Sequence, residues 1–239
     1  MAATFTPLIA AAQTPKQARV IVSLADNDNQ GIVPINASLG NGQSPRQNLY
    51  WGPLYGAKTH FKKMSGWTVK PKESQLADIL DAFDLAHEAH PNISISFEAW
   101  DGAAQKNAVK AYLSDLRDAE SGNSLVCFVG HNALMDLFVT NLPASRQSKQ
   151  MNLDRGRKGA VIACNSSLYF EPHHKALGIE SYVMTRGLMA PEAYVLEGLL
   201  LAWLEGKGGN IARQEAAKKY AEYQKIPVRS ANRLFGVKS

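Results

Sequence analysis

At 239 residues the chain can bury a sizeable hydrophobic core and is most economically a single domain. No run reaches the roughly 18 consecutive apolar residues that a membrane-spanning helix needs, so we expect no membrane partner. The formal net charge of +5 is carried by scattered basic residues, without a basic stripe interleaved with aromatic side chains. This pattern argues against a nucleic-acid partner.

The two cysteines, Cys127 and Cys164, give no disulfide framework. A chain that keeps an unpaired reactive thiol fits a reducing compartment better than an oxidising one. The first 14 residues lack the positively charged start of a signal peptide. A cytoplasmic location is therefore favoured; a secreted or periplasmic one stays open if a native leader was removed, and the oligomeric state stays open as well.

In the first half of the chain the apolar pattern predicts strands and helices in alternation. A β-branched run predicts a strand at 19–25, and the Asn-, Asp-, Gly- and Pro-rich stretch 26–48 predicts a long loop. Apolar residues at helical spacing predict a helix at 73–90, before Pro91. The other elements expected here are helical turns at 50–64, a strand at 93–100 and an amphipathic helix at 103–119.

The second half continues the alternation. Short apolar runs predict strands at 125–131, 160–164 and 181–185, and the polar, basic stretch 141–158 between the first two predicts a loop. Helices are expected at 133–139, 169–177, 191–204, 210–224 and 229–235. The alternation predicts an α/β three-layer sandwich, with one sheet of about five or six mostly parallel strands between two helical layers. We expect one domain over residues 1–239, with a flexible start at 1–17 and a helical C-terminal part at 190–239.

Two of the expected strands end on chemically reactive side chains. The first ends on His131, which follows Gly130, and the second ends on Cys164, which follows Ala163. In an open parallel sheet, ligands bind beyond the carboxyl ends of the strands. A thiol beside an imidazole is the minimal nucleophile and base pair. If the two strands are neighbours, the sequence predicts a cysteine hydrolase.

The same segments carry a family resemblance. The order of an apolar strand ending on Gly130-His131 and a second apolar strand ending on Ala163-Cys164 resembles the caspase-like cysteine peptidases of clan CD. The resemblance covers roughly residues 19–186. Asn132 stands where that family usually has glycine, and Ile162 stands where several members carry a polar residue that binds the P1 side chain.

The resemblance implies a caspase-like sheet and acyl transfer by a thiol. Cys164 would attack the scissile carbonyl of a peptide or protein substrate, and His131 would transfer protons. The backbone N–H groups of Cys164 and of Gly130 or a neighbour would form the oxyanion hole. Members of this family generally work with two catalytic residues and need no cofactor, so we expect neither a cofactor nor a third catalytic residue.

Loops at the same edge of the sheet are expected to bind the substrate. The candidate lining residues are Asp26, Asp28, Asn132, Ser166 and Arg186. An acidic lining from Asp26 or Asp28 would select Arg or Lys at P1, whereas Arg186 would select an acidic group. The competing interpretation of residues 26–29 is an Asx-rich turn, which is slightly favoured. Asp136 is interpreted as a surface or capping residue.

Two other functions stay open alongside the peptidase. One is a catalytically silent caspase-like module that binds a peptide or protein partner in the same groove. The other is a flavodoxin-like protein that binds a small ligand at the strand ends. The pair His173-His174 has no further ligands at metal-binding spacing, so we expect a solvated turn there and no metal site.

Overall fold

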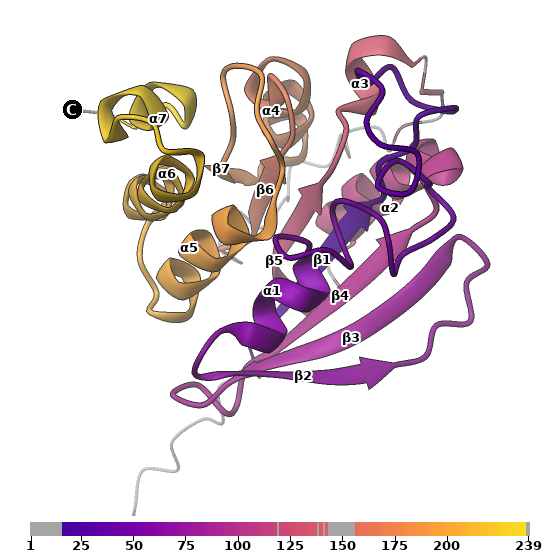
Figure 1. The fold of residues 1–239 in the computed structure, drawn as a ribbon. Helices are drawn as coiled ribbons and strands as arrows, with labels where there is room; N and C mark the ends of the chain where they lie inside the picture. Colours follow the sequence, from indigo (N-terminus) through magenta and orange to yellow (C-terminus); the bar gives the residue numbers. More distant parts are fainter. Residues whose placement is uncertain (1–15, 119, 138, 141, 143–155, 238–239) are drawn as a thin grey trace, which may run out of the picture.

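The computed structural model describes residues 16–118, 120–137, 139–140, 142 and 156–237. The expected flexible start at 1–17 and the expected loop at 141–158 lie mostly outside these residues. The fold is α/β, with one mixed sheet between two layers of helices (Figure 1). The expected fold class is confirmed.

The sheet has seven strands in the order β2-β3-β4-β1-β5-β6-β7. The strands are β1 (Gln17–Ser23), β2 (Trp67–Lys72), β3 (Ile79–His87), β4 (Ser94–Trp100), β5 (Asn123–Val129), β6 (Lys158–Ile162) and β7 (Glu180–Val183). The five strands β4, β1, β5, β6 and β7 all pair in parallel with their neighbours. At one side of the sheet, β3 pairs antiparallel with both β4 and β2. The carboxyl ends of β1, β4, β5, β6 and β7 therefore meet at one edge of the sheet.

Helices cover both faces of this sheet. They are α1 (Ala57–Lys63), α2 (Gln105–Arg117) after the 3-10 turn η1 (Gly102–Ala104), α3 (Ala133–Asp136), α4 (Ser166–Leu177), α5 (Ala193–Leu204), α6 (Gly209–Gln224) and α7 (Val228–Leu234). α1, α5, α6 and α7 contribute buried side chains to one core, and α2 and α4 contribute to the other. Figure 1 shows α1 and α5 in front of the sheet.

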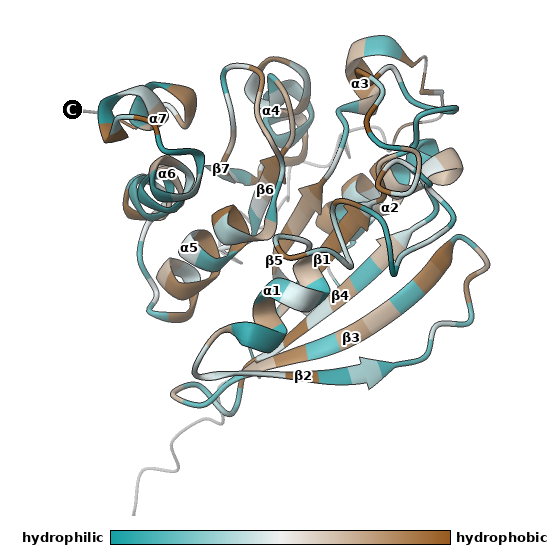
Figure 2. Cartoon of the chain, viewed as in Figure 1, coloured by the Kyte–Doolittle hydropathy of each residue, from teal (hydrophilic) through white to brown (hydrophobic). Residues whose placement is uncertain are grey.

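The central strands are buried on both faces, which explains their unbroken apolar sequences. In β1, Val20 and Val22 enter the core beneath α1 and α5, while Ile21 points to the opposite core with Tyr112 of α2. Figure 2 shows the contrast between the hydrophobic central strands and the mostly hydrophilic outer strand β2. The side-chain alternation of a strand thus supplies both cores at once.

The helix expected at 73–90 is wrong, because this segment contains the strand β3. Leu76, which fitted the helical spacing, is 57% exposed. Phe83 instead stacks on Phe97 of β4, with ring centroids 4.6 Å apart. Pairing with two neighbouring strands and this aromatic contact outweigh the local helical periodicity, since β preference depends largely on cross-strand packing.

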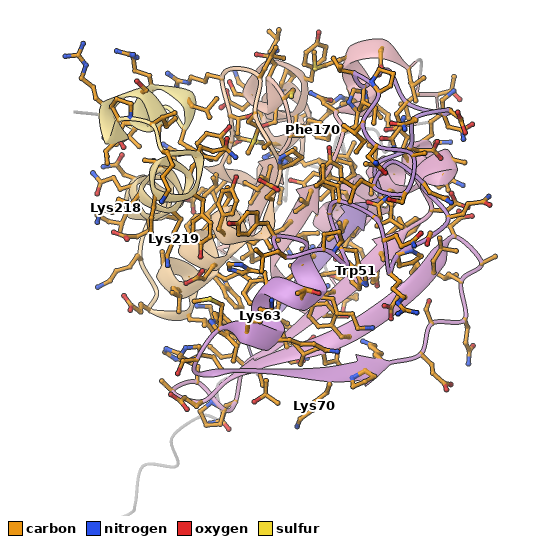
Figure 3. All side chains as sticks on the ribbon, viewed as in Figure 1. Trp51, Lys63, Lys70, Phe170, Lys218 and Lys219 are labelled. Carbon is orange, nitrogen blue, oxygen red and sulfur yellow. The ribbon has the colours of Figure 1, made fainter. Side chains whose placement is uncertain are left out.

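The strand β2 was not expected from the sequence at all. It forms one outer edge of the sheet, and Lys70, Pro71 and Lys72 are exposed there. In Figure 3, Lys70 projects from β2 away from the sheet. Lysine and proline are typical of edge strands because they discourage pairing with another chain, but they also hide the strand pattern from sequence reading.

The expected solvated turn at His173-His174 is also wrong, because both residues lie in α4. His174 is fully buried; its Nε2 is 2.7 Å from the Tyr112 hydroxyl, and its Nδ1 is 3.0 Å from the Ser181 hydroxyl. Burial, and then the charge of His173, lowers the pKa of His174 from 6.5 to about 3. His174 is therefore a neutral core residue that ties α4 to α2 and β7.

This buried histidine makes stability depend on pH. Below about pH 6.5 His174 takes up a proton in the unfolded chain but not in the folded one, until about pH 3. From this residue alone, the free energy of unfolding falls by up to about 1.4 kcal/mol per pH unit as pH drops through that window. Urea unfolding of His174→Gln at several pH values should show a shallower slope, on a baseline lowered by about 1–3 kcal/mol.

The matched control is His90→Gln, in the turn between β3 and β4, outside this hydrogen-bond network. It should keep the slope of the parent protein. An unchanged slope in His174→Gln would show that His174 is not the buried neutral group.

Candidate active site

His131 and Cys164 follow neighbouring strands, as the sequence predicted. β5 and β6 pair in parallel, with Val129 opposite Ile162. Each reactive residue comes two positions after the last paired residue of its strand. Neighbouring strands lie about 4.8 Å apart, so the register delivers both backbones side by side at the carboxyl edge.

Gly130 makes the turn that presents His131. Its φ is +136°, a conformation that L side chains rarely adopt, and a Cβ there would lie 2.5 Å from the Ser23 carbonyl oxygen. The end of β5 therefore passes directly against the end of β1. Only glycine allows this close approach.

Asn132 connects the two reactive segments. Its Nδ2 donates to the Cys164 carbonyl oxygen at 2.7 Å, and its Oδ1 accepts from the Leu134 N–H at 3.1 Å, capping α3. The side chain is completely buried. The residue expected to line the substrate site thus fixes the loop after β5 to the loop after β6.

His131 forms an ion-pair contact that sequence analysis missed. Its Nε2 lies 2.9 Å from Asp136 Oδ2 and 3.1 Å from Oδ1, and its side chain is 10% exposed. Gly31, in the loop after β1, packs so closely on this carboxylate that a Cβ there would lie 1.7 Å from Oδ2. Asp136 was interpreted as a surface or capping residue, and the only sequence signal was its position shortly after His131.

This contact selects the tautomer of His131. An ionised carboxylate only accepts hydrogen bonds, so Nε2 carries the hydrogen and Nδ1 is the unprotonated nitrogen of the neutral ring. Nδ1 makes no hydrogen bond to any residue that the structure describes. It is the nitrogen available to take up a proton.

The thiol of Cys164 is half-buried and held by backbone. Its Sγ accepts from the Met189 N–H at 3.4 Å and lies 3.5 Å from the Met189 carbonyl oxygen. Cys164 and His131 share no hydrogen bond with each other in this structure. The arrangement is therefore that of two neighbouring groups, each positioned by a different partner.

The expected oxyanion hole is corrected in one respect. The Gly130 N–H donates to the Ile162 carbonyl oxygen at 3.2 Å, continuing the sheet ladder, so it is not free to bind an oxyanion. The Cys164 N–H makes no hydrogen bond to the described residues. Of the two expected donors, the Cys164 N–H is the one that the geometry leaves accessible to a ligand.

Asp26 supports the alternative of an Asx-rich turn. The carboxylate is buried and accepts from the Asp28 N–H at 2.9 Å, the Asn29 N–H at 3.0 Å and Asn29 Nδ2 at 3.0 Å. Three hydrogen bonds from its own turn hold this buried carboxylate in the loop after β1, which corrects the substrate-binding role expected for it. Asp28 lies exposed in the same turn.

Ser166 and Arg186 are also placed differently from expectation. Ser166 is buried and donates to the Val161 carbonyl oxygen at 2.8 Å, tying the start of α4 to β6. The Arg186 guanidinium packs against Gly236, just after α7. Ser166 is thus a structural residue, and no described contact brings Arg186 to Cys164.

Two tyrosines that sequence analysis missed lie near Cys164. Burial raises the pKa of the Tyr50 and Tyr220 hydroxyls, and the charges of Cys164 and Glu192 raise both further. The Tyr220 hydroxyl accepts from the Ala190 N–H at 3.3 Å, one residue after the backbone group that holds the thiol. Tyr50 comes from the loop before α1 and Tyr220 from α6, so their approach to Cys164 depends on tertiary packing.

The described residues contain no group of three or more His, Cys, Asp or Glu side chains that could hold a metal ion. No helix among them is both long and apolar enough to cross a membrane. No protein-family model, curated protein or solved structure matches this chain. The function of this chain is therefore inferred from the geometry of its site.

Proposed function

We propose that this protein is a caspase-like cysteine peptidase in which Cys164 is the nucleophile and His131 transfers protons. The observation that carries the proposal is the register of β5 and β6. In this register the backbones that carry a thiol and an imidazole lie side by side beyond the carboxyl ends of neighbouring parallel strands, the usual place for ligands in such a sheet.

The residues around the pair support a definite sequence of bond changes. The Cys164 proton passes to His131 Nδ1 as Sγ bonds to the scissile carbonyl carbon. The C–N bond then breaks, and the amine leaves with the proton from His131. Water next attacks the thioester, giving its proton to His131 and from there to the departing sulfur.

Asp136 is a positioning residue in this scheme. Its hydrogen bond from His131 Nε2 directs Nδ1 to the reacting groups, and its negative charge stabilises the imidazolium formed when the thiol loses its proton. In this scheme the Cys164 N–H, which has no acceptor among the described residues, donates to the oxyanion that forms on the carbonyl oxygen. The catalytic residues are Cys164 and His131 themselves.

Exposed apolar side chains favour a peptide over a small polar substrate. Val33, Leu168 and Leu188 are 85%, 71% and 75% exposed. They lie in the connections that follow β1, β6 and β7, and Leu188 directly precedes Met189, which holds the thiol. Apolar side chains exposed in the connections beyond the carboxyl ends of the strands can bind the apolar side chains of a peptide.

A thiol-directed reagent tests the proposal. A peptidyl chloromethylketone should modify Cys164 in the native protein at least about 10-fold faster than the same residue in the urea-unfolded chain, because the native site supplies a base and binds the peptide. Peptide mapping by mass spectrometry separates Cys164 from Cys127, which is fully buried. His131→Ala should remove the excess rate, and equal rates in the native and unfolded chains would refute the proposal.

One observation favours a second candidate, a caspase-like module that binds a peptide without cleaving it. The thiol is held by the Met189 backbone and the imidazole by Asp136, rather than each by the other. For such a module, the chloromethylketone and a peptide aldehyde of the same sequence should bind, but no peptide should be cleaved. Turnover of any peptide that is lost in Cys164→Ala excludes this candidate.

A further inference from the structure

Glu192 is a half-buried carboxylate without a cation. It lies directly before α5, and its Oε2 accepts from the Tyr194 hydroxyl at 2.7 Å and from Gln224 Nε2 at 3.4 Å. No Lys, Arg or His of the described residues forms an ion pair with it. Burial raises its pKa above the usual value, and the Tyr194 hydrogen bond offsets only part of this.

Three other carboxylates that are largely buried each have a nearby cation or several hydrogen-bond donors. Glu197 lies 2.9 Å from His60 Nε2 and 2.8 Å from Lys219 Nζ. Asp115 lies 3.2 Å from an Arg19 nitrogen, and Asp26 accepts three N–H groups. Glu192 has only two neutral donors, the Tyr194 hydroxyl and the Gln224 amide, and no ion-pair partner among the described residues, so no opposite charge there offsets its removal from water.

Glu192 lies close to the proposed nucleophile. The segment that holds the Cys164 thiol through Met189 runs directly into Glu192. The charges of Cys164 and Glu192 both raise the pKa of the Tyr50 and Tyr220 hydroxyls, so the two acidic groups act on the same pair of hydroxyls. Ala190, between Met189 and Glu192, donates its N–H to the Tyr220 hydroxyl at 3.3 Å.

We infer that Glu192 binds the positively charged side chain of an arginine or lysine next to the scissile bond. The inference rests on the proposed peptidase site and adds its substrate class. A guanidinium or ammonium group would supply the missing counter-charge through a charge-assisted hydrogen bond. The Tyr220 hydroxyl, which accepts from the Ala190 N–H, has a second lone pair for the donors of such a side chain.

The inference assigns the selection of a basic P1 side chain to Glu192 instead of to Asp26 or Asp28 in the loop after β1. Asp26 has its oxygens occupied by the turn that it closes. Asp28 is exposed to water, where an ion pair gains little. Glu192 combines partial burial with an absence of ion-pair partners among the described residues, and both features strengthen its interaction with an incoming cation.

Fluorogenic peptides that differ only at P1 test the inference. The parent protein should cleave after Arg or Lys with a kcat/KM roughly 10- to 100-fold higher than after Leu, the range expected for a hydrogen bond to a charged group. Glu192→Gln keeps the shape and removes the charge; it should abolish this preference while changing cleavage after Leu less than about 3-fold. Glu171→Gln, an exposed glutamate on α4, is the matched control and should keep the preference.

A second measurement uses the parent protein alone, so it requires neither peptide cleavage nor a correctly folded Glu192 variant. Nα-acetyl-argininamide should protect Cys164 of the parent protein from iodoacetamide at concentrations at least about 10-fold lower than Nα-acetyl-leucinamide. Equal protection by the two amides would overturn the inference. So would an arginine preference that persists in Glu192→Gln, or a parent protein that prefers Leu or Asp at P1.

The same experiments show separately whether the proposed peptidase function fails. If the protein is not a peptidase, the chloromethylketone should modify Cys164 no faster in the native than in the unfolded chain, and no peptide in the series should be cleaved. Selective protection by the arginine amide in a protein without turnover would still support the cation site. Cleavage without a basic preference would leave the peptidase and refute the role of Glu192.

Discussion

Replacing Cys164 by alanine is expected to abolish peptide cleavage, with kcat reduced by at least about 10⁴-fold, because no other group can form the thioester. The thiol lies at the edge of the sheet and is half-buried, so its loss should change the free energy of unfolding by less than about 2 kcal/mol. Cleavage of a fluorogenic peptide and urea unfolding measure the two quantities. Undiminished cleavage by Cys164→Ala would show that the nucleophile is another residue.

Cys127 provides the matched control. It is fully buried in β5, facing the core beneath α5, and burial raises the pKa of its thiol. Cys127→Ala should retain activity and lose about 1 kcal/mol of stability from the small cavity. The two variants are thus expected to differ in activity: Cys164→Ala abolishes cleavage, whereas Cys127→Ala retains it.

Asp136→Asn is expected to lower kcat by about 10²- to 10⁴-fold, the range expected when the group that orients a catalytic histidine is lost. An asparagine amide can donate to Nε2, which would stabilise the tautomer with its hydrogen on Nδ1 and remove the base facing the substrate. It also removes the charge that stabilises the imidazolium. KM should change less than about 3-fold, because Asp136 contacts His131 and not the substrate.

A fall in kcat with little change in KM would show that Asp136 positions His131, rather than only stabilising the fold. Asp84→Asn, which breaks an exposed ion pair with Lys72 on the far side of the sheet, is the control and should leave both constants unchanged. A fall in stability of Asp136→Asn with an unchanged kcat would mean that Asp136 only holds α3. A kcat within 3-fold of the parent would remove Asp136 from the mechanism.

Local sequence was a good guide where burial was extreme. The apolar runs of β1, β5 and β6 could be identified because strands buried on both faces tolerate few polar residues. The same local pattern failed at β3, whose apolar residues match a helical period. There the contact between Phe83 and Phe97, far apart in sequence, decides between helix and strand.

The candidate site divides in the same way. The sequence by itself determined that His131 and Cys164 end apolar strands, and the residue types at those ends already pointed to thiol chemistry. The adjacent position of their backbones follows from the parallel pairing of β5 and β6, which the structure shows. Sequence spacing could not place Asp136, because its contact with His131 depends on the one-turn helix α3, its Asn132 cap and the close packing of Gly31.

Only the tertiary structure decided which acidic groups are already engaged by the fold. Asp26 and Glu192 are indistinguishable as carboxylates in a sequence, but Asp26 accepts three N–H groups of its own loop, whereas Glu192 is half-buried and has no ion-pair partner among the described residues. The physical reason is that strand burial is encoded locally in apolar periodicity. The partner of a polar side chain is instead set by packing between loops that follow different strands.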